Sequence, residues 1–412
     1  MGYRMRGKTK VTERAARYLA RVEPGELVGP SDLPRLQQAF LSSELFETVS
    51  VALEPADGGV LVVATVKDKH SWIIAPAVYW LPGRRSVGVG FAENNLRGEN
   101  QKLLLYGQLG DRESLLFATY LDPSVRGTPL TYRYDLYLYR RVVSEYANPT
   151  DDPTDDDIAR ETTTDYLGGG ILLGWRFAWW LTTDLRLRGA KVTFHDAHDP
   201  DAPDVPLPLP ERDGWDVSTQ WRLTLDARQY RYGVRWGPFV QLAGDTTIPG
   251  LDDYDYSSAL LRAFYGWRLF EEHQLELRGI AAIGRDLPFH EELTLGGVGD
   301  LRGYAVDRFR GDVRTLARIE YSVPIAKWKF FAFRALGFWD SGYAGLHHPR
   351  TDPARDYLPG QTAGTGWWRN DVGAGFRVYV KAVVLPLLGL DIAYGVEARA
   401  TEVYFQLGIT DF

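Results

Sequence analysis

The chain has 412 residues, no cysteine, two methionines and a formal net charge of −7. Its length would fit two or three soluble domains. Without cysteine it has no disulfide, thiolate metal site or thiol nucleophile, and its acidic balance argues against a nucleic-acid partner. A mean hydropathy of −0.26 and the lack of an apolar run of about 18 residues exclude a membrane-spanning helix. No signal peptide is expected at the start, yet aromatic residues reach 13%.

Residues 1–70 have the pattern of a small α/β domain. The expected elements, in chain order, are a strand at Gly2–Gly7, helices at Thr12–Arg21 and Ser31–Ser43, and strands at Thr48–Glu54 and Val60–Lys67. Ser31 is the expected N-cap of the second helix, and Asp57-Gly58-Gly59 is the turn between the last two strands. The order β-α-α-β-β predicts a domain that is large enough for marginal independent stability.

The start of this domain matches a nucleotide-binding motif by its letters alone. Gly2–Thr9 fits GxxxxGKT, but a working phosphate-binding loop lies between a buried strand and a helix. Here the segment is itself strand-like. We therefore expect no nucleotide site.

From Ser71 onward the hydrophobic pattern has a period of two residues. In Trp179–Lys191, for example, Leu185 and Leu187 alternate with Arg186. One face of each strand is therefore apolar and the other is charged. A soluble sandwich would pack the apolar faces together, whereas a membrane barrel would place them on lipid and the charged faces in its lumen.

Three observations favour the barrel. The strands run to about 10 residues, the length that crosses a bilayer at a tilt, against about 5–6 in ordinary sheets. Tryptophan and tyrosine gather near the strand ends, as they do at membrane interfaces. Arginines on a lipid-facing surface would cost about 2–4 kcal/mol each, so the charged faces are expected to line a lumen.

The number and spacing of the strands give a further test. Sixteen strands are expected, near residues 71–80, 86–93, 101–109, 114–121, 131–141, 164–176, 181–193, 215–226, 234–243, 256–268, 273–283, 313–323, 328–340, 370–380, 387–395 and 402–411. The long connections, 142–163, 194–214, 284–312 and 341–369, all follow odd-numbered strands. Outer-membrane barrels have this asymmetry between short turns and long loops. The predicted fold is therefore mainly β, with a 16-stranded antiparallel transmembrane barrel at 71–412.

No segment predicts catalysis or a bound cofactor. His195–Asp199 and His347-His348 lie in long polar loops without a third ligand at a fitting spacing, and we interpret them as solvated. The acidic run at 151–157 lacks the glycine and the final glutamate of a calcium loop. Because GxSxG and a placeable pair of carboxylates are also missing, we expect no enzyme, no cofactor and no metal site.

The most informative segment is Leu293–Pro324, LTLGGVGDLRGYAVDRFRGDVRTLARIEYSVP. It begins within a long connection and is rich in glycine, including Gly296, Gly297 and Gly299. Glycines at this density indicate a loop that packs closely on other backbone.

Arg302 within this loop would need carboxylate partners if the loop entered the barrel. Glu320 lies on the inward face of the following strand, and Asp340 ends the next one. A loop folded back into the lumen would present Arg302 to both. The alternative is that Arg302 is an ordinary exposed loop residue.

The tetrapeptide Leu301-Arg302-Gly303-Tyr304, followed by EYSVP and GFWDSG, resembles the BamA/TamA superfamily of outer-membrane assembly barrels. In that family the sixth extracellular loop inserts a (V/L)RG(F/Y) tip into the lumen, where acidic residues of the next two strands hold it. The resemblance implies that Glu320 and Asp340 latch Arg302 within a lumen-inserted loop at 284–312.

Two other segments resemble the same family. Glu93–Gly98 is similar to the turn between its second and third barrel strands, and the residues that carry this likeness are Asn94, Asn95, Leu96 and Gly98. The domain at 1–70 resembles a POTRA domain, which captures client strands at its sheet edge.

The resemblance implies insertion or translocation of polypeptides at the bacterial outer membrane, with the POTRA-like domain in the periplasm. Expected partners are outer-membrane lipids, unfolded polypeptide clients and periplasmic or lipoprotein factors, with no nucleic acid, and the barrel is expected to be monomeric. Pro76 removes a backbone donor from the first strand, so the seam with the last strand is predicted to open laterally. The residues assigned to this seam are Trp72, Pro76, Val78, Phe405, Leu407 and Gly408.

Two other functions remain open. A barrel plugged by its own loop could be a passive pore or a membrane anchor, which would conduct ions without accelerating the folding of clients. A soluble all-β carbohydrate-binding protein would need no detergent.

Overall fold

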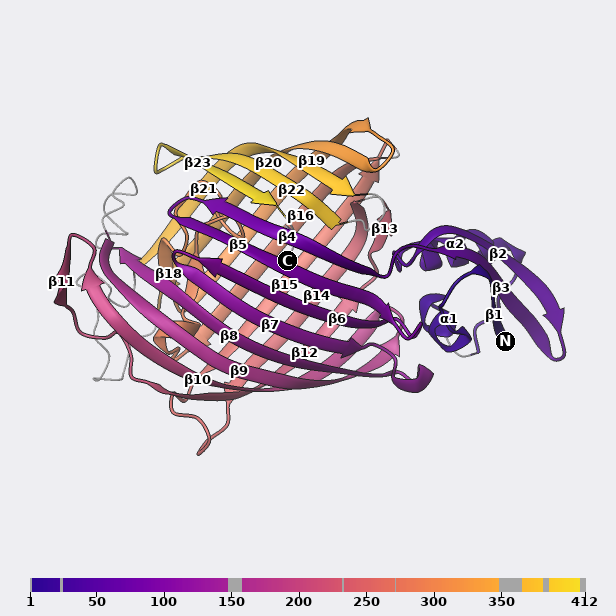
Figure 1. Ribbon diagram of the computed structural model, residues 1–412, viewed down its shortest axis with the longest axis horizontal. Helices are drawn as coiled ribbons and strands as arrows, with labels where there is room; N and C mark the ends of the chain where they lie inside the picture. The colour runs from indigo at the N-terminus through magenta and orange to yellow at the C-terminus, as the bar shows by residue number, and fades with distance from the viewer. Residues whose placement is uncertain are drawn as a thin grey trace.

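The computed structural model describes residues 2–22, 25–146, 158–231, 233–270, 272–347, 365–380 and 385–407. A small N-terminal domain and a large closed barrel follow one another along the longest axis of the molecule (Figure 1). Within the described ranges, no helix has the length and apolar character needed to cross a membrane. The acidic run at 151–157, His348 and Gly408 lie outside the described residues.

The N-terminal domain is a three-stranded sheet with two helices packed against it. Its elements are β1 (Gly2–Lys8), α1 (Glu13–Leu19), the 3-10 turn η1 (Pro30–Asp32), α2 (Leu33–Leu41), β2 (Phe46–Ala56) and β3 (Gly59–Asp68). β3 is central, parallel to β1 and antiparallel to β2. Leu36 and Phe40 of α2 are fully buried against Val62 of the sheet, so the apolar face of this helix forms the core.

The GxxxxGKT segment and the expected cap at Ser31 both lie in well-defined elements of this domain. The segment that fits GxxxxGKT is strand β1 and pairs with β3 along its length. The prediction that Ser31 caps the second helix was wrong, because Ser31 lies inside η1 and α2 begins at Leu33. Pro30 starts the 3-10 turn, and the Asp32 carboxylate accepts a hydrogen bond from the backbone N of Gly29 at 2.9 Å. The chain is therefore already turned before α2 begins.

The barrel closes from sixteen antiparallel strands, which confirms the predicted fold class. These strands are β4 (Trp72–Leu81), β5 (Arg84–Leu96), β6 (Gln101–Gly110), β7 (Glu113–Asp122), β8 (Leu130–Tyr146), β9 (Ile158–Ala178), β10 (Leu181–Asp199), β12 (Gly214–Asp226), β14 (Val234–Thr247), β15 (Ser257–Leu269), β16 (His273–Arg285), β19 (Val313–Lys327), β20 (Phe331–Leu346), β21 (Thr365–Val380), β22 (Leu385–Gly395) and β23 (Ala400–Leu407). The short strands β11 (Ala202–Pro206) and β13 (Gln229–Arg231) pair beside β10 and β14. The 3-10 turn η2 (Val125–Gly127) connects β7 to β8.

Apolar side chains point outward from the barrel wall and charged side chains point inward. On β10, Leu185 and Leu187 are 56% and 48% exposed, whereas Arg186 between them lies 3.1 Å from the buried carboxylate of Asp135 on β8. A charge on the lipid face would cost about 2–4 kcal/mol near the membrane midplane. The alternation in the sequence therefore assigns one face to lipid and the other to the lumen.

Long connections and short turns lie at opposite rims of the barrel. The long connections follow β8, β10, β16 and β20, and the turn between β9 and β10 consists of Trp179 and Trp180 alone. The N-terminal domain lies at the rim of the short turns, away from β11 (Figure 1). There the guanidinium of Arg21 stacks 5.1 Å from the ring centroid of Trp179, so the domain contacts this rim.

Candidate functional site

The connection between β16 and β19 folds back into the lumen. It contains the 3-10 turn η3 (Phe289–Glu291) and a hairpin of β17 (Leu293–Leu295) with β18 (Phe309–Gly311). Residues 296–308 form the tip between these two strands. Leu301 in the tip is fully buried and belongs to a cluster that includes Trp367 of β21. The tip therefore packs against the barrel wall.

Two of the three assigned loop glycines are required by the shape of the tip. Gly296 and Gly297 have φ of 127° and 94°, a region that residues with a side chain rarely adopt. A Cβ on Gly296 would lie 2.2 Å from the carbonyl oxygen of Ala305. Gly299 differs, because an added Cβ there would meet nothing within 4 Å.

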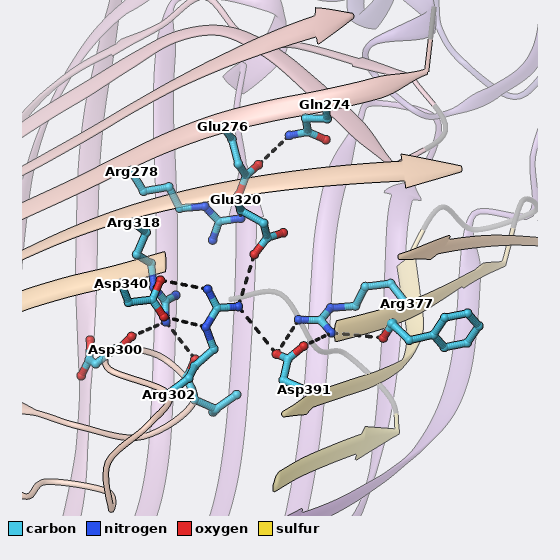
Figure 2. Close-up of polar contacts among 12 residues, drawn as sticks. Gln274, Glu276, Arg278, Asp300, Arg302, Arg318, Glu320, Asp340, Arg377 and Asp391 are labelled. Atoms are coloured by element: carbon cyan, nitrogen blue, oxygen red, sulfur yellow. Dashed lines mark hydrogen bonds and ion pairs between the residues drawn. The ribbon is translucent and has the colours of Figure 1, made fainter. Parts of the chain in front are cut away.

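Arg302 is buried, with 3% of its surface exposed, and its guanidinium forms a bidentate contact with Asp340 of β20. Nε donates to Oδ2 at 2.7 Å and Nη2 donates to Oδ1 at 2.9 Å. Nη1 donates to Oε2 of Glu320 on β19 at 3.3 Å (Figure 2). The guanidinium also lies over the ring of Phe338, 3.3 Å from its centroid. The structure thus brings together the three residues assigned to the latch.

Two carboxylates that sequence reasoning did not assign complete this site. Asp391 of β22 lies 3.8 Å from Nη1 of Arg302 and accepts hydrogen bonds from Arg377 of β21 at 2.6 and 2.7 Å (Figure 2). Asp371 of β21 accepts a hydrogen bond from the backbone N of Gly303 at 3.0 Å. Both occupy positions at which the alternation of their strands directs the side chain into the lumen. This alternation is the sequence signal that could have identified them as site residues.

Gly303 and Tyr304 hold the tip against the last strands of the barrel. A Cβ on Gly303 would lie 2.5 Å from the backbone N of Gly395, so the two chains approach too closely for a side chain. The Tyr304 hydroxyl donates to the carboxylate of Glu397. The Tyr304 carbonyl accepts from the hydroxyl of Tyr404 on β23 at 3.2 Å. The tetrapeptide 301–304 is therefore in contact with β19 through β23.

The barrel closes where β4 meets β23. Among the described residues this junction has three pairs in register, namely Val78 with Leu407, Tyr79 with Gln406 and Trp80 with Phe405. Ten pairs join β4 to β5. The described part of β23 ends at Leu407, so these three pairs are the part of the junction that the structure describes.

The structure places three of the residues assigned to the seam at the β4–β23 junction and two of them away from it. Val78, Phe405 and Leu407 lie in the three pairs. Trp72 and Pro76 pair with β5 and face no described residue of β23. Trp72 and Trp80, near the two ends of β4, are 53% and 57% exposed, so β4 carries one exposed indole at each end.

The turn between β5 and β6 is the contact between the barrel and the start of α1. The Gly98 carbonyl accepts from the backbone N of Thr12 at 2.9 Å, and a Cβ on Gly98 would lie 1.9 Å from the carbonyl oxygen of Lys10. The Asn95 side chain accepts from the backbone N of Asn100 at 2.9 Å. Asn94 and Leu96 contribute backbone, through Asn94 N to Ser71 O at 2.7 Å and the pair of Leu96 with Gln101. This turn therefore positions the N-terminal domain.

A second charged cluster joins the same loop to β10 and β12 of the barrel wall. The sequence analysis did not identify this cluster. Arg188 of β10 lies 2.8 Å from both Asp216 of β12 and Glu291 of η3. His290 Nε2 is 3.2 Å from the same Asp216 carboxylate. Asp216, His290 and Glu291 are close enough together to hold a metal ion, but the guanidinium already supplies positive charge between the carboxylates. We interpret the cluster as an ion-pair network that holds η3 against the wall.

The barrel sequence matches a known protein family. Residues 95–410 match the family model of the Omp85 superfamily domain. No curated protein sequence matches the chain.

Solved structures with the same fold include CdiB from two bacteria and BamA from a third. CdiB from Escherichia coli superposes with a TM-score of 0.63 at 13% identity, covering 99% of this chain and 76% of CdiB. CdiB from Acinetobacter baumannii gives 0.56 at 16% identity, covering 98% and 74%. BamA from Haemophilus ducreyi, in a form lacking POTRA domains 1–3, gives 0.57 at 14% identity, covering 99% and 84%. At these identities the likeness establishes the fold.

Replacing Arg302 by alanine should destabilise the barrel. The change leaves Asp340 buried without its bidentate partner, and breaking a buried ion pair in this way typically costs about 3–5 kcal/mol. On gels, the folded form of Arg302→Ala should convert to the unfolded form at a lower temperature than the parent. Arg285→Ala removes an arginine whose side chain is 80% exposed at the end of β16 and is the matched control. Identical conversion temperatures for Arg302→Ala and the parent would rule out the latch.

A methyl group at Gly303 should be far more harmful than one at Gly299. Gly303→Ala forces Cβ against the backbone of Gly395, and overpacking of this kind costs about 1–3 kcal/mol, whereas Gly299→Ala meets open space. The same gel conversion, read over a temperature series, measures both variants. Equal effects of the two substitutions would contradict the close packing of the tip.

Proposed function

The chain belongs to the Omp85 superfamily, and from this premise we propose that it inserts polypeptides into the outer membrane or translocates them across it. Barrels of this family reside in the bacterial outer membrane. The N-terminal domain at 1–70 is assigned as a POTRA-like domain and the barrel at 71–412 as the membrane-embedded part. Because the short turns of such barrels face the periplasm, the position of the N-terminal domain at that rim supports a periplasmic location.

The observation that carries the proposal is the junction between β4 and β23, where the first strand of the barrel meets the last. On β4, Val78, Tyr79 and Trp80 pair with described residues of β23, and Pro76 has no backbone N–H to donate to a neighbouring strand. Unpaired backbone N–H and C=O groups at a strand edge readily accept another strand, and in lipid they have no water to pair with. An incoming client strand could therefore pair with β4 and enter the membrane sideways.

The N-terminal domain supports capture of the client next to this seam. β2 is an edge strand of its sheet, and an extended peptide can add to such an edge through main-chain hydrogen bonds. A cavity of about 920 Å³ lies between this domain and the barrel rim, and Phe46 of β2, Trp72 of β4 and Phe330 are among its lining residues. A strand released from the domain would reach the start of β4 through this space.

The lumen loop supports the proposal through its position. Arg302 and its carboxylates tie the loop to β19 and β20, so the loop is held in the lumen, on the inner side of the β4–β23 junction. We assign unfolded polypeptides as clients, outer-membrane lipids as the surroundings of a monomeric barrel, and periplasmic or lipoprotein factors as partners.

A disulfide across the seam should abolish activity. In Tyr79→Cys/Gln406→Cys the two cysteines occupy paired positions, and the parent has no cysteine of its own. In liposomes, the reduced double variant should accelerate the folding of an unfolded barrel substrate as the parent does, and the oxidised form should not. Locking the seam prevents β4 from pairing with a client.

The control is the same chemistry at a long junction. Ala259→Cys/Ile283→Cys joins paired positions of β15 and β16, and its oxidised form should stay active. Full activity of the oxidised seam variant would exclude lateral opening. If the parent itself conducts ions without accelerating substrate folding, the protein is a plugged passive pore or anchor.

A further inference from the structure

The lumen loop carries a second buried charge of the opposite sign, five positions after Arg302. Asp307 is 7% exposed and lies 3.1 Å, through Oδ2, from Nη2 of Arg84 on β5. The same carboxylate oxygen pairs with Arg141 on β8. Oδ1 accepts a hydrogen bond from the hydroxyl of Thr294 at 2.8 Å. Arg84, Arg141 and Thr294 all donate to this carboxylate, as expected of an ionised group.

The surroundings of Asp307 are adapted to hold it in this position. Its backbone has φ of 60°, a conformation uncommon for a residue with a side chain, so contacts around it keep the strained geometry. Burial alone would raise the pKa of Asp307, but Arg141 and Arg84 hold that pKa well below its ordinary value. The next residue, Arg308, stacks 4.4 Å from the ring centroid of Tyr146 at the end of β8. Two adjacent loop residues therefore contact the same strand.

The charged contacts of Arg302 and of Asp307 lie on opposite sides of the seam. Around the barrel the order of strands is β19, β20, β21, β22, β23, β4, β5 and onward to β8, and β23 and β4 lie beside each other in Figure 1. Arg302 binds carboxylates of β19 and β20, on the β23 side. Asp307 binds arginines of β5 and β8, on the β4 side. The loop thus spans the β4–β23 junction from inside the lumen.

We propose that Asp307, with Arg84 and Arg141, forms one end of a clasp whose other end is Arg302, and that this clasp controls opening of the seam. Three backbone pairs hold the seam directly among the described residues. The clasp adds two sets of buried ion pairs, which can be broken only by leaving charges unpaired in the lumen. Release of Asp307 removes the ion pairs that tie β5 and β8 to the loop, while Arg302 keeps the loop on β19 and β20.

This inference rests on the proposed function, because the clasp would regulate the lateral opening through which clients enter the membrane. The test contains no client, so its outcome is independent of the liposome experiment. Amide hydrogen exchange, followed by mass spectrometry on the folded barrel in detergent, reports how often each strand pair opens. Asp307→Asn removes the charge at nearly constant shape, and Arg141→Gln removes a partner from the wall.

Both variants should exchange roughly tenfold faster than the parent in Trp72–Leu81 and Ala400–Leu407, because coupled ion pairs in one network contribute at this level. Exchange in β14 and β15 should stay unchanged. Asp300→Asn is the matched control, since Asp300 is a loop carboxylate that pairs with Arg314 of β19 and does not span the seam. Its exchange should equal that of the parent.

Three results would overturn the clasp. These are parent-like exchange at the seam in both Asp307→Asn and Arg141→Gln, equal acceleration by Asp300→Asn, and acceleration spread evenly over all strands. If Asp307→Asn does not fold, Arg141→Gln decides the matter, because Arg84 remains to pair with Asp307 in that variant.

Discussion

A guanidinium enclosed in a barrel has to be paired, and the structure around Arg302 follows from this constraint. Removing two charges from water costs several kcal/mol per ion unless geometry and hydrogen bonds compensate. Here Asp340 provides a bidentate partner and Glu320 a third hydrogen bond. Because these carboxylates come from neighbouring strands, one loop residue ties the loop to both. The turns at Gly296 and Gly297 bring the tip of the loop close to Asp340 and Glu320. The shape of the loop therefore allows Arg302 to form these ion pairs.

Much of the fold could be predicted because it depends on local alternation along each strand. The pattern of Leu185, Arg186 and Leu187 determines which side chains meet lipid and which meet the lumen, and this local pattern is repeated from strand to strand. The parity of long loops then assigns the two rims. The cap of α2 was predicted wrongly at Ser31, because a proline-initiated 3-10 turn precedes the helix and leaves no side-chain cap for it to form.

Part of the candidate site could also be predicted, because some of its residues lie close to the loop in sequence and on the inward face of their strands. Glu320 and Asp340 follow the loop directly in sequence, so inward parity and the resemblance placed them beside Arg302. The inward parity of β22 could have nominated Asp391 as a lumen residue, but the partners of Asp391 and Asp307 depend on how the barrel closes and on where the loop crosses the lumen. Neither is encoded in a local pattern. Pairs such as Asp307 with Arg84, which are 223 positions apart, become visible only in three dimensions.

The exposed indoles at the two ends of β4 determine the direction in which β4 would move in the proposed opening of the seam. Trp72 and Trp80 are separated by roughly 26 Å along an extended strand, which at the tilt of barrel strands spans most of an apolar band about 25 Å tall. Tryptophan prefers the boundary between lipid tails and headgroups. With one such anchor near each boundary, β4 is held at a fixed depth in the bilayer. It resists sliding along its own axis, so the register of Val78, Tyr79 and Trp80 is preserved, and motion in the plane of the membrane is the direction left to it.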